Sequence, residues 1–339
     1  MFYLKVGILM TLLSPLFATT TTRAAFDIGS GDTKLTVAEV DLEKNQMTRI
    51  LFETFESIPL REDLAESKDG LLSIKIQDQL IHCLKEMQKK AKPFEPTAWN
   101  GIGTSVFRTA KNGKQCLDRV LEETGLSISL IPQLEEAEIG FLSAVAASKL
   151  EKEEIIAWDS GSGSFQFSTW IDSTILMFGS EFGFVPALEI LFFSRKQPYS
   201  LNTSPNPIRQ EEALQLSLSI QEQLPKAPEW IKDESKSICT IGGKTSIFSI
   251  AAIATHSNVY TKDQIFQAIL DTCEKTDEEL IHFPDPREVG VSLTLIYSVM
   301  KQYGIEKVFY HPTNGSCEGI LLHPLYWNTL KNTFTHFTN

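Results

Sequence analysis

Two short loops rich in glycine and serine, each led by an aspartate, carry the residues of this chain that are best suited to bind phosphate. Asp27 leads the first loop, which contains Gly29 and Ser30. Asp159 leads the second loop, which reads Ser160-Gly161-Ser162-Gly163-Ser164. Glycine lets a loop backbone approach a ligand closely, and successive N–H groups in such a loop form a site for an anion. The leading carboxylates can hold a metal ion or position a water molecule, so two facing loops would hold a phosphate chain from both sides.

Each loop lies between two apolar stretches, which indicates an internal repeat. A single glycine-rich turn is typical of an ordinary β-hairpin and needs no ligand. Two copies with an aspartate at the same offset favour two related α/β halves with the ligand in the cleft between them.

The hydrophobic pattern predicts the elements that position the loops. In each half we expect an antiparallel meander of three strands that contains the loop, followed by alternating helices and strands. The strands expected in the first half cover residues 23–28, 34–40, 47–55, 99–104 and 127–131, with helices over 71–90, 115–124 and 135–150. The strands expected in the second half cover residues 154–158, 165–170, 173–178, 237–241 and 307–310, with helices over 184–193, 211–223, 261–275, 287–303 and 315–325.

The bulk properties indicate a globular protein of two domains. The chain has 339 residues, of which 42% are hydrophobic and 22% charged. Its net charge of −12 repels nucleic acid and anionic membranes, so we expect neither nucleic-acid binding nor stable membrane insertion. The five cysteines have no C-x-x-C spacing and the six histidines form no metal-binding pair, so no zinc site is expected. A phosphate substrate must be held by local cations, loop N–H groups and a divalent ion, because the overall field repels it.

The first 24 residues have the pattern of a secretory signal peptide. Lys5 is followed by an apolar run over residues 6–13 and by small residues up to Ala18. The apolar run is too short to span a bilayer comfortably. We expect residues 1–24 to direct export to the periplasm or the extracellular space, with an extra cytoplasmic segment as the alternative.

Several segments, taken in order, resemble motifs of the exopolyphosphatase and guanosine pentaphosphate phosphohydrolase (Ppx/GppA) family. The first loop resembles that family's first phosphate loop, and residues 159–164 resemble its D-x-G-G-G-S second loop. Residues 103–112 resemble its G-T-x-x-x-R-x-A-x-N segment, and residues 131–137 resemble its I-S-G-x-E-E-A segment. Further glycine positions follow in the family's order, namely Gly183, Gly242-Gly243 and residues 315–319.

This resemblance implies an α/β fold of two actin-like (ribonuclease-H-like) domains with the active site in the cleft between them. Domain I would cover residues 25–150 and domain II residues 151–314, with a C-terminal helix at 315–330 that packs back on domain I. The implied activity is Mg²⁺-dependent hydrolysis that removes the terminal phosphate from inorganic polyphosphate or from guanosine penta- or tetraphosphate. The expected partners are that substrate and a second copy of the chain in a homodimer.

The resemblance also implies roles for individual residues. Glu136 is the expected general base for the attacking water, with Glu135 as its neighbour; successive helical residues do not share a face, so only one of them is expected in the cleft. Asp159 and Asp27 are the expected Mg²⁺ ligands, and Arg108 is the expected phosphate clamp. The remaining phosphate-binding residues are Gly29, Ser30, Gly161, Ser162, Gly163 and Ser164, with Lys34 and Lys111 as secondary candidates.

Several positions depart from the family pattern, among them Gly31-Asp32-Thr33 in the first loop and Ser160 and Ser162 in the second. Gln166 stands where the family usually has a glutamate that helps to hold the metal or the water; it stays a catalytic candidate through its carbonyl oxygen, without a negative charge. Cys317 stands where an arginine is usual. These departures leave three hypotheses: a hydrolase, a catalytically degenerate protein that binds polyphosphate or a nucleotide without turnover, and a kinase of the same fold with a nucleotide pocket at Gly242-Gly243.

Overall fold

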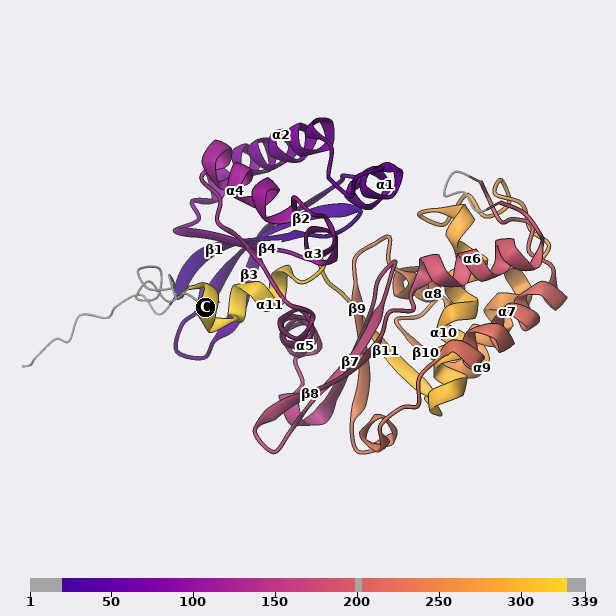
Figure 1. The fold of residues 1–339 in the computed structure, drawn as a ribbon. Helices are drawn as coiled ribbons and strands as arrows, with labels where there is room; N and C mark the ends of the chain where they lie inside the picture. Colours follow the sequence, from indigo (N-terminus) through magenta and orange to yellow (C-terminus); the bar gives the residue numbers. More distant parts are fainter. Residues whose placement is uncertain (1–19, 199–202, 328–339) are drawn as a thin grey trace, which may run out of the picture.

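The computed structural model describes residues 20–198 and 203–327, which form two α/β halves, each built on one mixed sheet (Figure 1). The first sheet has the strand order β3-β2-β1-β4-β5. Strands β1, β2 and β3 are antiparallel neighbours, whereas β4 and β5 run parallel to β1. The bounds are β1 Thr20–Ile28, β2 Asp32–Asp41, β3 Gln46–Ser57, β4 Ala98–Gly103 and β5 Ile128–Leu130. The first loop is the hairpin between β1 and β2.

Helices cover both faces of the first sheet, which explains why β1 is apolar at consecutive positions. Phe26 and Ile28 pack in one core with α2 and α4, whereas Ala25 packs in another with α5 and α11. Two short helices, α1 and α3, complete this half. The bounds are α1 Leu60–Glu66, α2 Ile74–Ala91, α3 Ser105–Thr109, α4 Gly113–Thr124, α5 Gln133–Ser148 and α11 Cys317–Leu322.

The C-terminal helix α11 returns from the second half to pack on the first sheet and on α5 (Figure 1). A Cβ at Gly319 would overlap the carbonyl oxygen of Ile139, and the Gly319 N–H donates a hydrogen bond to Ser143 Oγ at 2.8 Å. Only glycine permits this approach of the two backbones. The last segment of the chain therefore belongs to the first half, and it carries residues 314–318 to the end of β1.

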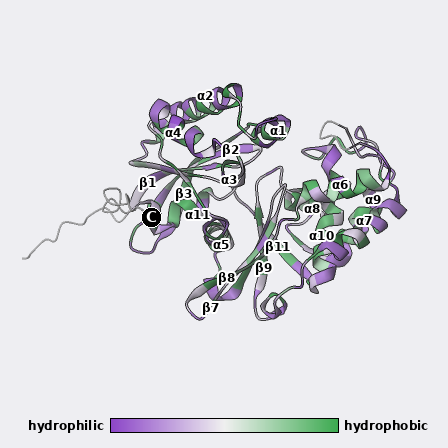
Figure 2. Ribbon diagram, in the orientation of Figure 1, coloured by the Kyte–Doolittle hydropathy of each residue, from purple (hydrophilic) through white to green (hydrophobic). Residues whose placement is uncertain are grey.

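The second sheet has the strand order β10-β11-β9-β6-β7-β8, with the second loop as the hairpin between β6 and β7. Its strands are β6 Ile155–Ser160, β7 Phe165–Ile171, β8 Thr174–Ser180, β9 Ser237–Gly242, β10 Val259–Thr261 and β11 Lys307–Pro312. The helices of this half are α6 Phe184–Ser194, α7 Gln210–Gln223, α8 Ile247–Thr255, α9 Lys262–Thr272 and α10 Val289–Tyr303. They form the largest core with one face of the sheet, and Figure 2 shows hydrophobic residues gathered where α6, α8 and α10 meet the strands. Short 3₁₀ helices lie at Lys92–Phe94, Lys152–Glu154, Glu229–Lys232, Pro286–Glu288 and Pro324–Tyr326.

Helix α5 lies between the two sheets. Ile139 packs in the core of the first sheet, whereas Phe141 and Ala144 pack against Ala157 and Cys239 of the second sheet. A helix that is buried on opposite sides must be apolar on both, as its central residues are. The expected domain boundary at residue 150 thus assigns to the first half a helix that serves both.

Most expected elements occur within a few residues of their expected bounds, but β1 begins earlier than expected. Ala24 is fully buried in the middle of this strand, paired with Val37 and Trp99. A boundary after residue 24 would cut the central strand of the first sheet, so the folded region begins no later than Thr20. The expected signal peptide otherwise falls on residues 1–19, which lie outside the described residues.

The elements that the sequence analysis missed are α1, α3, α8 and β10. Helix α8 is hydrophobic on nearly all sides, so it shows no amphipathic period, and the other three are only a few residues long. Among the described residues, no helix combines the length and the hydropathy that crossing a membrane requires.

Candidate active site

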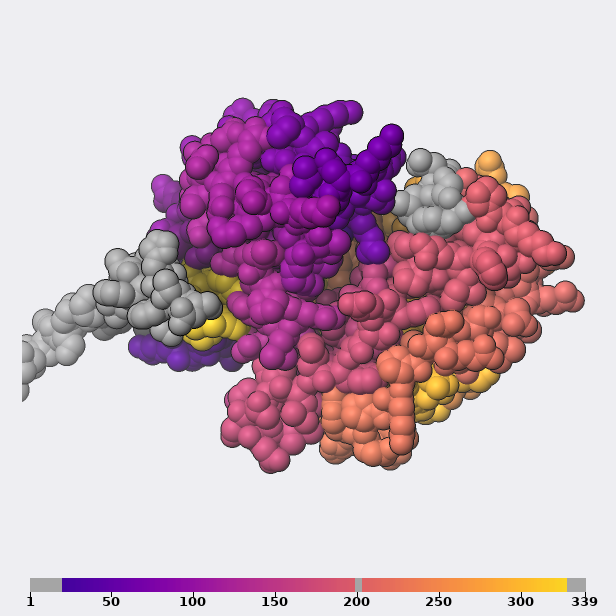
Figure 3. Space-filling model, in the orientation of Figure 1, coloured from indigo at the N-terminus to yellow at the C-terminus, as the bar shows by residue number. Residues whose placement is uncertain are grey.

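The two glycine-serine loops close in the same way. The Gly29 N–H donates to the Asp32 carbonyl at 2.9 Å, and the Gly161 N–H donates to the Ser164 carbonyl at 2.9 Å. Both loops thus join antiparallel strands through the same hydrogen bond at the same offset from the leading aspartate. This equivalence supports the repeat inferred from the sequence. The surface between the two halves is hollowed (Figure 3).

Helix α6 holds the second loop from behind. The N–H groups of Phe184 and Val185 donate to the carbonyls of Gly161 and Ser162, at 3.3 and 2.7 Å. These bonds occupy the carbonyl side of the loop. In the described part of the chain, the N–H groups of Ser162 and Gly163 have no acceptor, which is the arrangement that an anion-binding loop requires.

Asp27, Asp159 and Lys34 form a charged group between the two loops. Burial raises the pKa of Asp159 to about 6 against the charge of Lys34, and the charge of Asp27 adds to the rise. Burial by itself lowers the pKa of Lys34, but the carboxylates of Asp27, Asp32 and Asp159 outweigh it and raise this pKa. The Ser316 N–H, from the turn before α11, donates to Asp27 Oδ2 at 3.0 Å. Two predicted metal ligands from opposite halves therefore lie close enough to repel each other, with a lysine as their internal counter-ion.

This carboxylate pair fits the coordination that Mg²⁺ prefers. Mg²⁺ is commonly held by one or two carboxylates together with waters and substrate phosphates, rather than by a complete cage of protein ligands. Asp27 and Asp159 supply such a pair, and their mutual repulsion is the property that a cation would relieve. The described residues contain no group of three or more His, Cys, Asp or Glu side chains placed for a metal, so any bound Mg²⁺ would keep several waters and phosphate ligands.

Glu136 and Arg108 are paired with each other beside this group. Arg108 Nη2 lies 2.8 Å from Glu136 Oε2, and Arg108 Nη1 donates to the Ile131 carbonyl at 2.9 Å. Burial raises the pKa of Glu136, with Arg108 opposing the rise and the charges of Asp27 and Asp159 adding to it. The structure thus places the expected base near both carboxylates. The expected phosphate clamp already orients that base.

Glu135 does not enter this group. Its carboxylate accepts a hydrogen bond from the Tyr326 hydroxyl, on the side of α5 away from Glu136. Of the two adjacent glutamates, Glu136 is thus paired with Arg108 and Glu135 with Tyr326, and a catalytic role of Glu135 stays a prediction.

The remaining predicted side chains lie in the loops but are bonded to protein partners. Gln166 faces Asp159 across the β6–β7 pair and donates from Nε2 to Ser164 Oγ at 3.0 Å. The hydroxyls of Ser30 and Ser105 are 2.9 Å apart and join the first loop to α3. Lys111 lies away from the loops, where its Nζ donates to the Asp69 carbonyl.

Two residues near the site were missed by the sequence analysis. Arg61 is the second residue of α1, and its guanidinium lies against Gly163 of the second loop. Glu318 is only 3% exposed; its Oε1 accepts from the Asn314 N–H at 2.8 Å and so holds the turn whose Ser316 N–H reaches Asp27. Arg61 carried no signal in the sequence, whereas Glu318 lies in the segment 315–319 that resembles the family but was given no role there.

Replacing Glu318 with glutamine should change how stability depends on pH. Burial raises the pKa of Glu318 from 4.5 to about 7. The folded protein therefore binds this proton more tightly than the unfolded chain, and wild-type stability falls as the pH rises from about 4.5 to about 7. Glutamine keeps the acceptor for Asn314 and does not titrate, so the variant should gain on the order of 2–3 kcal/mol relative to wild type between pH 5 and 8.

Urea unfolding at both pH values would measure this gain. The matched control is Glu122→Gln, an exposed glutamate on α4, which should follow the wild type at each pH. A stability difference between Glu318→Gln and wild type that does not grow from pH 5 to pH 8 would contradict the assignment.

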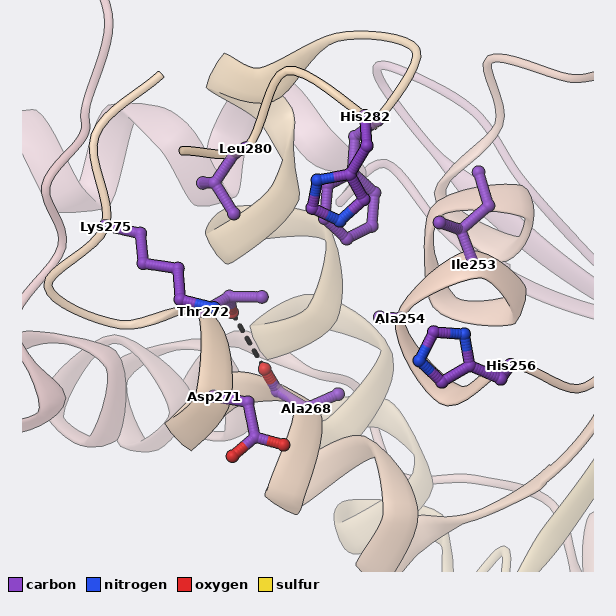
Figure 4. A pocket seen from close by; sticks show the side chains of 10 residues that line it. Ile253, Ala254, His256, Ala268, Asp271, Thr272, Lys275, Leu280 and His282 are labelled. Atoms are coloured by element: carbon purple, nitrogen blue, oxygen red, sulfur yellow. Dashed lines mark hydrogen bonds between the residues drawn. The ribbon is translucent and has the colours of Figure 1, made fainter. Parts of the chain in front are cut away.

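Two hollows of the described residues lie in the second half, away from the two loops. One, of about 150 Å³, lies between α8 and α9, with His256 and His282 pointing into it (Figure 4). The other is an open depression of about 560 Å³ beside β11, lined by Lys244 and Tyr310. Neither is lined by a residue of the predicted site.

Comparisons with known proteins agree with this arrangement. Residues 36–201 match the model of the Ppx/GppA phosphatase family. The chain is 28% identical over 151 residues to a bifunctional 3-dehydroquinate synthase/phosphatase of Fusobacterium nucleatum, a match that covers 43% of this chain and 22% of that one. It is 27% identical over 146 residues to exopolyphosphatase 1 of Mycobacterium tuberculosis, covering 43% of this chain and 41% of that one. The chain thus matches less than half the length of these curated relatives.

Solved structures match over most of the chain. A Ppx/GppA family member from Aquifex aeolicus superposes with a TM-score of 0.71 at 21% identity, covering 89% of this chain and 97% of that one. An exopolyphosphatase from Cytophaga hutchinsonii superposes with a TM-score of 0.68 at 17% identity, covering 89% and 96%. These likenesses confirm the two-domain actin-like fold. Over residues 36–201, just under half of its length, and through its motifs, the chain is similar to the Ppx/GppA phosphatase family.

Proposed function

We propose that this protein is a Mg²⁺-dependent phosphoanhydride hydrolase that releases the terminal phosphate of inorganic polyphosphate or of guanosine penta- or tetraphosphate. The observation that carries the proposal is the pair of equivalent loops whose leading aspartates, Asp27 and Asp159, meet between the two halves. The similarity of residues 36–201 to the Ppx/GppA phosphatase family supports the phosphoanhydride class of substrate.

Phosphoryl transfer depends on positioning, charge neutralisation and an oriented water more than on covalent chemistry. Asp27 and Asp159 would hold Mg²⁺, which neutralises charge on the phosphate oxygens when bound. The free N–H groups of Ser162 and Gly163 would hold phosphate oxygens. Glu136 would accept the proton of the attacking water, and burial, which raises its pKa, makes it a stronger base than an exposed glutamate.

Arg108 orients Glu136 in this scheme. Its guanidinium bonds both to the carboxylate of Glu136 and to the carbonyl of Ile131 at the end of β5, so the base is fixed to the sheet. Its guanidinium still has further N–H donors for a phosphate oxygen, which keeps the clamp role as part of the proposal.

Phosphate release from short-chain polyphosphate and from guanosine pentaphosphate, with Mg²⁺ and then with EDTA, tests the function. We expect phosphate release that EDTA abolishes. The substrate that is hydrolysed faster would identify the substrate class, either polyphosphate or guanosine polyphosphate. Export through the N-terminal segment is a separate proposal; it favours polyphosphate, because guanosine alarmones are cytoplasmic. Release that continues undiminished in EDTA would refute the metal requirement.

A second candidate is a degenerate member that binds polyphosphate or a nucleotide without turnover. Its supporting observation is Gln166, which is uncharged beside Asp159 and is bonded to Ser164. Cys317 adds to it, because this residue is fully buried and supplies no cation. Binding of tripolyphosphate without phosphate release from either substrate would select this function over hydrolysis.

A further inference from the structure

Arg61 contacts both glycine-serine loops. Its backbone N–H donates to the Ser30 carbonyl in the first loop at 2.9 Å. Its side chain extends to the second loop, where a Cβ at Gly163 would overlap Nη1 of the guanidinium. Arg61 is exposed to solvent, so it lies at the mouth of the site rather than in its interior.

The other cations near the loops are close to carboxylates, whereas Arg61 has no ion-pair partner among the described residues. Lys34 lies among Asp27, Asp32 and Asp159, and Arg108 is paired with Glu136. Within residues 20–198 and 203–327, the Arg61 guanidinium has no hydrogen-bond or ion-pair partner. Its planar fork of N–H donors matches the oxygens of a phosphate group. The net charge of −12 repels a polyanion at long range, so an arginine without an ion-pair partner between the two loops is suited to attract one locally.

We propose that Arg61 binds phosphate oxygens of the phosphoanhydride chain where the two loops meet, so that the substrate is held from both halves at once. Arg61 is then a determinant of affinity and not the base or the metal ligand, because a guanidinium stays protonated and has no acceptor atom. The inference rests on the proposed function and specifies the residue that holds the substrate at the entrance.

Gly163 provides the space for this contact. Its backbone is not left-handed, so alanine is compatible with its conformation. The added methyl group would displace the guanidinium from the second loop and leave the arginine charge in place. Gly163→Ala therefore tests the position of Arg61, whereas Arg61→Ala tests its presence.

The experiment is calorimetric binding of inorganic tripolyphosphate to the full chain, in EDTA and again in Mg²⁺. Arg61→Ala loses the charge-assisted hydrogen bonds from the guanidinium to phosphate, so its Kd for tripolyphosphate should rise roughly 10- to 100-fold. Arg61→Lys should lie between this variant and wild type, because the ammonium keeps the charge without the fork. The matched control is Arg49→Ala, an exposed arginine paired with Glu39 toward the other end of the first sheet, which should stay within twofold.

A double variant separates contact from general electrostatics. If Gly163→Ala acts by displacing Arg61, its effect should nearly vanish in the Arg61→Ala background. Fully additive losses, an Arg61→Ala Kd within twofold of wild type, or an equal loss in Arg49→Ala would each overturn the inference. Thermal melting of every variant separates loss of binding from loss of folding.

The outcomes for Arg61 and for the hydrolase are distinguishable. Wild-type protein that binds tripolyphosphate but releases no phosphate would refute hydrolysis, and the Arg61 comparison would still stand. Wild-type protein that hydrolyses polyphosphate, with unchanged binding in Arg61→Ala, would refute this inference alone. Absence of tripolyphosphate binding by wild type would overturn this inference and leave the hydrolase to be judged on phosphate release from guanosine pentaphosphate.

Discussion

Replacing Glu136 with glutamine should lower the rate of phosphate release by about 10²–10⁴-fold while leaving the Kd for tripolyphosphate within a few-fold. A positioned general base contributes about that factor to a rate. Glutamine has the same shape and keeps an acceptor for Arg108, which lies 2.8 Å from the glutamate in the wild type, but it cannot take a proton. Steady-state phosphate release and calorimetric binding measure the two quantities separately.

The neighbouring glutamate is the control. Glu135→Gln removes the same charge from the adjacent residue, whose carboxylate is bonded to Tyr326 and does not face the loops. We expect its rate to stay within a few-fold of wild type. Equal losses in the two variants would assign the effect to the helix rather than to the base, and full activity in Glu136→Gln would remove Glu136 from the mechanism.

Replacing Asp159 with asparagine should abolish Mg²⁺-dependent release, by about 10³-fold or more, and should weaken Mg²⁺ binding. The substitution removes one of two carboxylates proposed to hold the ion, and a bound cation supplies several kcal/mol of charge stabilisation in phosphoryl transfer. Titration of activity and of binding heat with Mg²⁺ measures both effects. Asp172→Asn, at an exposed turn of the same half, is the matched control and should behave as wild type.

The same variant should make the metal-free protein more stable. The pKa of Asp159 is raised to about 6, so the folded state disfavours its ionised form, and this cost is fully present above about pH 6. Asparagine removes it and should add on the order of 1–3 kcal/mol to the free energy of unfolding at pH 8 in EDTA. A gain in stability joined to a loss of activity would identify Asp159 as a functional residue rather than a structural one. A destabilised variant would contradict this charge arrangement.

The two loops show how much of the site could be predicted from short segments of the sequence. Asp27 and Asp159 were recognised because glycine, serine and aspartate act through the backbone of their own turn, so type and spacing carry the information. The flanking strands were recognised for the same reason, since alternation along a strand is local. The pair Glu135 and Glu136 shows the limit: spacing indicated that the two would face different ways, but only the packing of α5 decided which one reaches the cleft.

The sequence by itself determined the repeat, the two α/β halves and the residues that lead each loop, because these features follow from short-range backbone chemistry. Only the tertiary structure decided that α5 is shared by two sheets and that α11 returns to hold Asp27. It also decided that Lys34 lies between opposed carboxylates and that Arg61 reaches Gly163. Each of these depends on burial and charge between residues far apart in the chain, and such contacts leave no period or motif in the sequence around them.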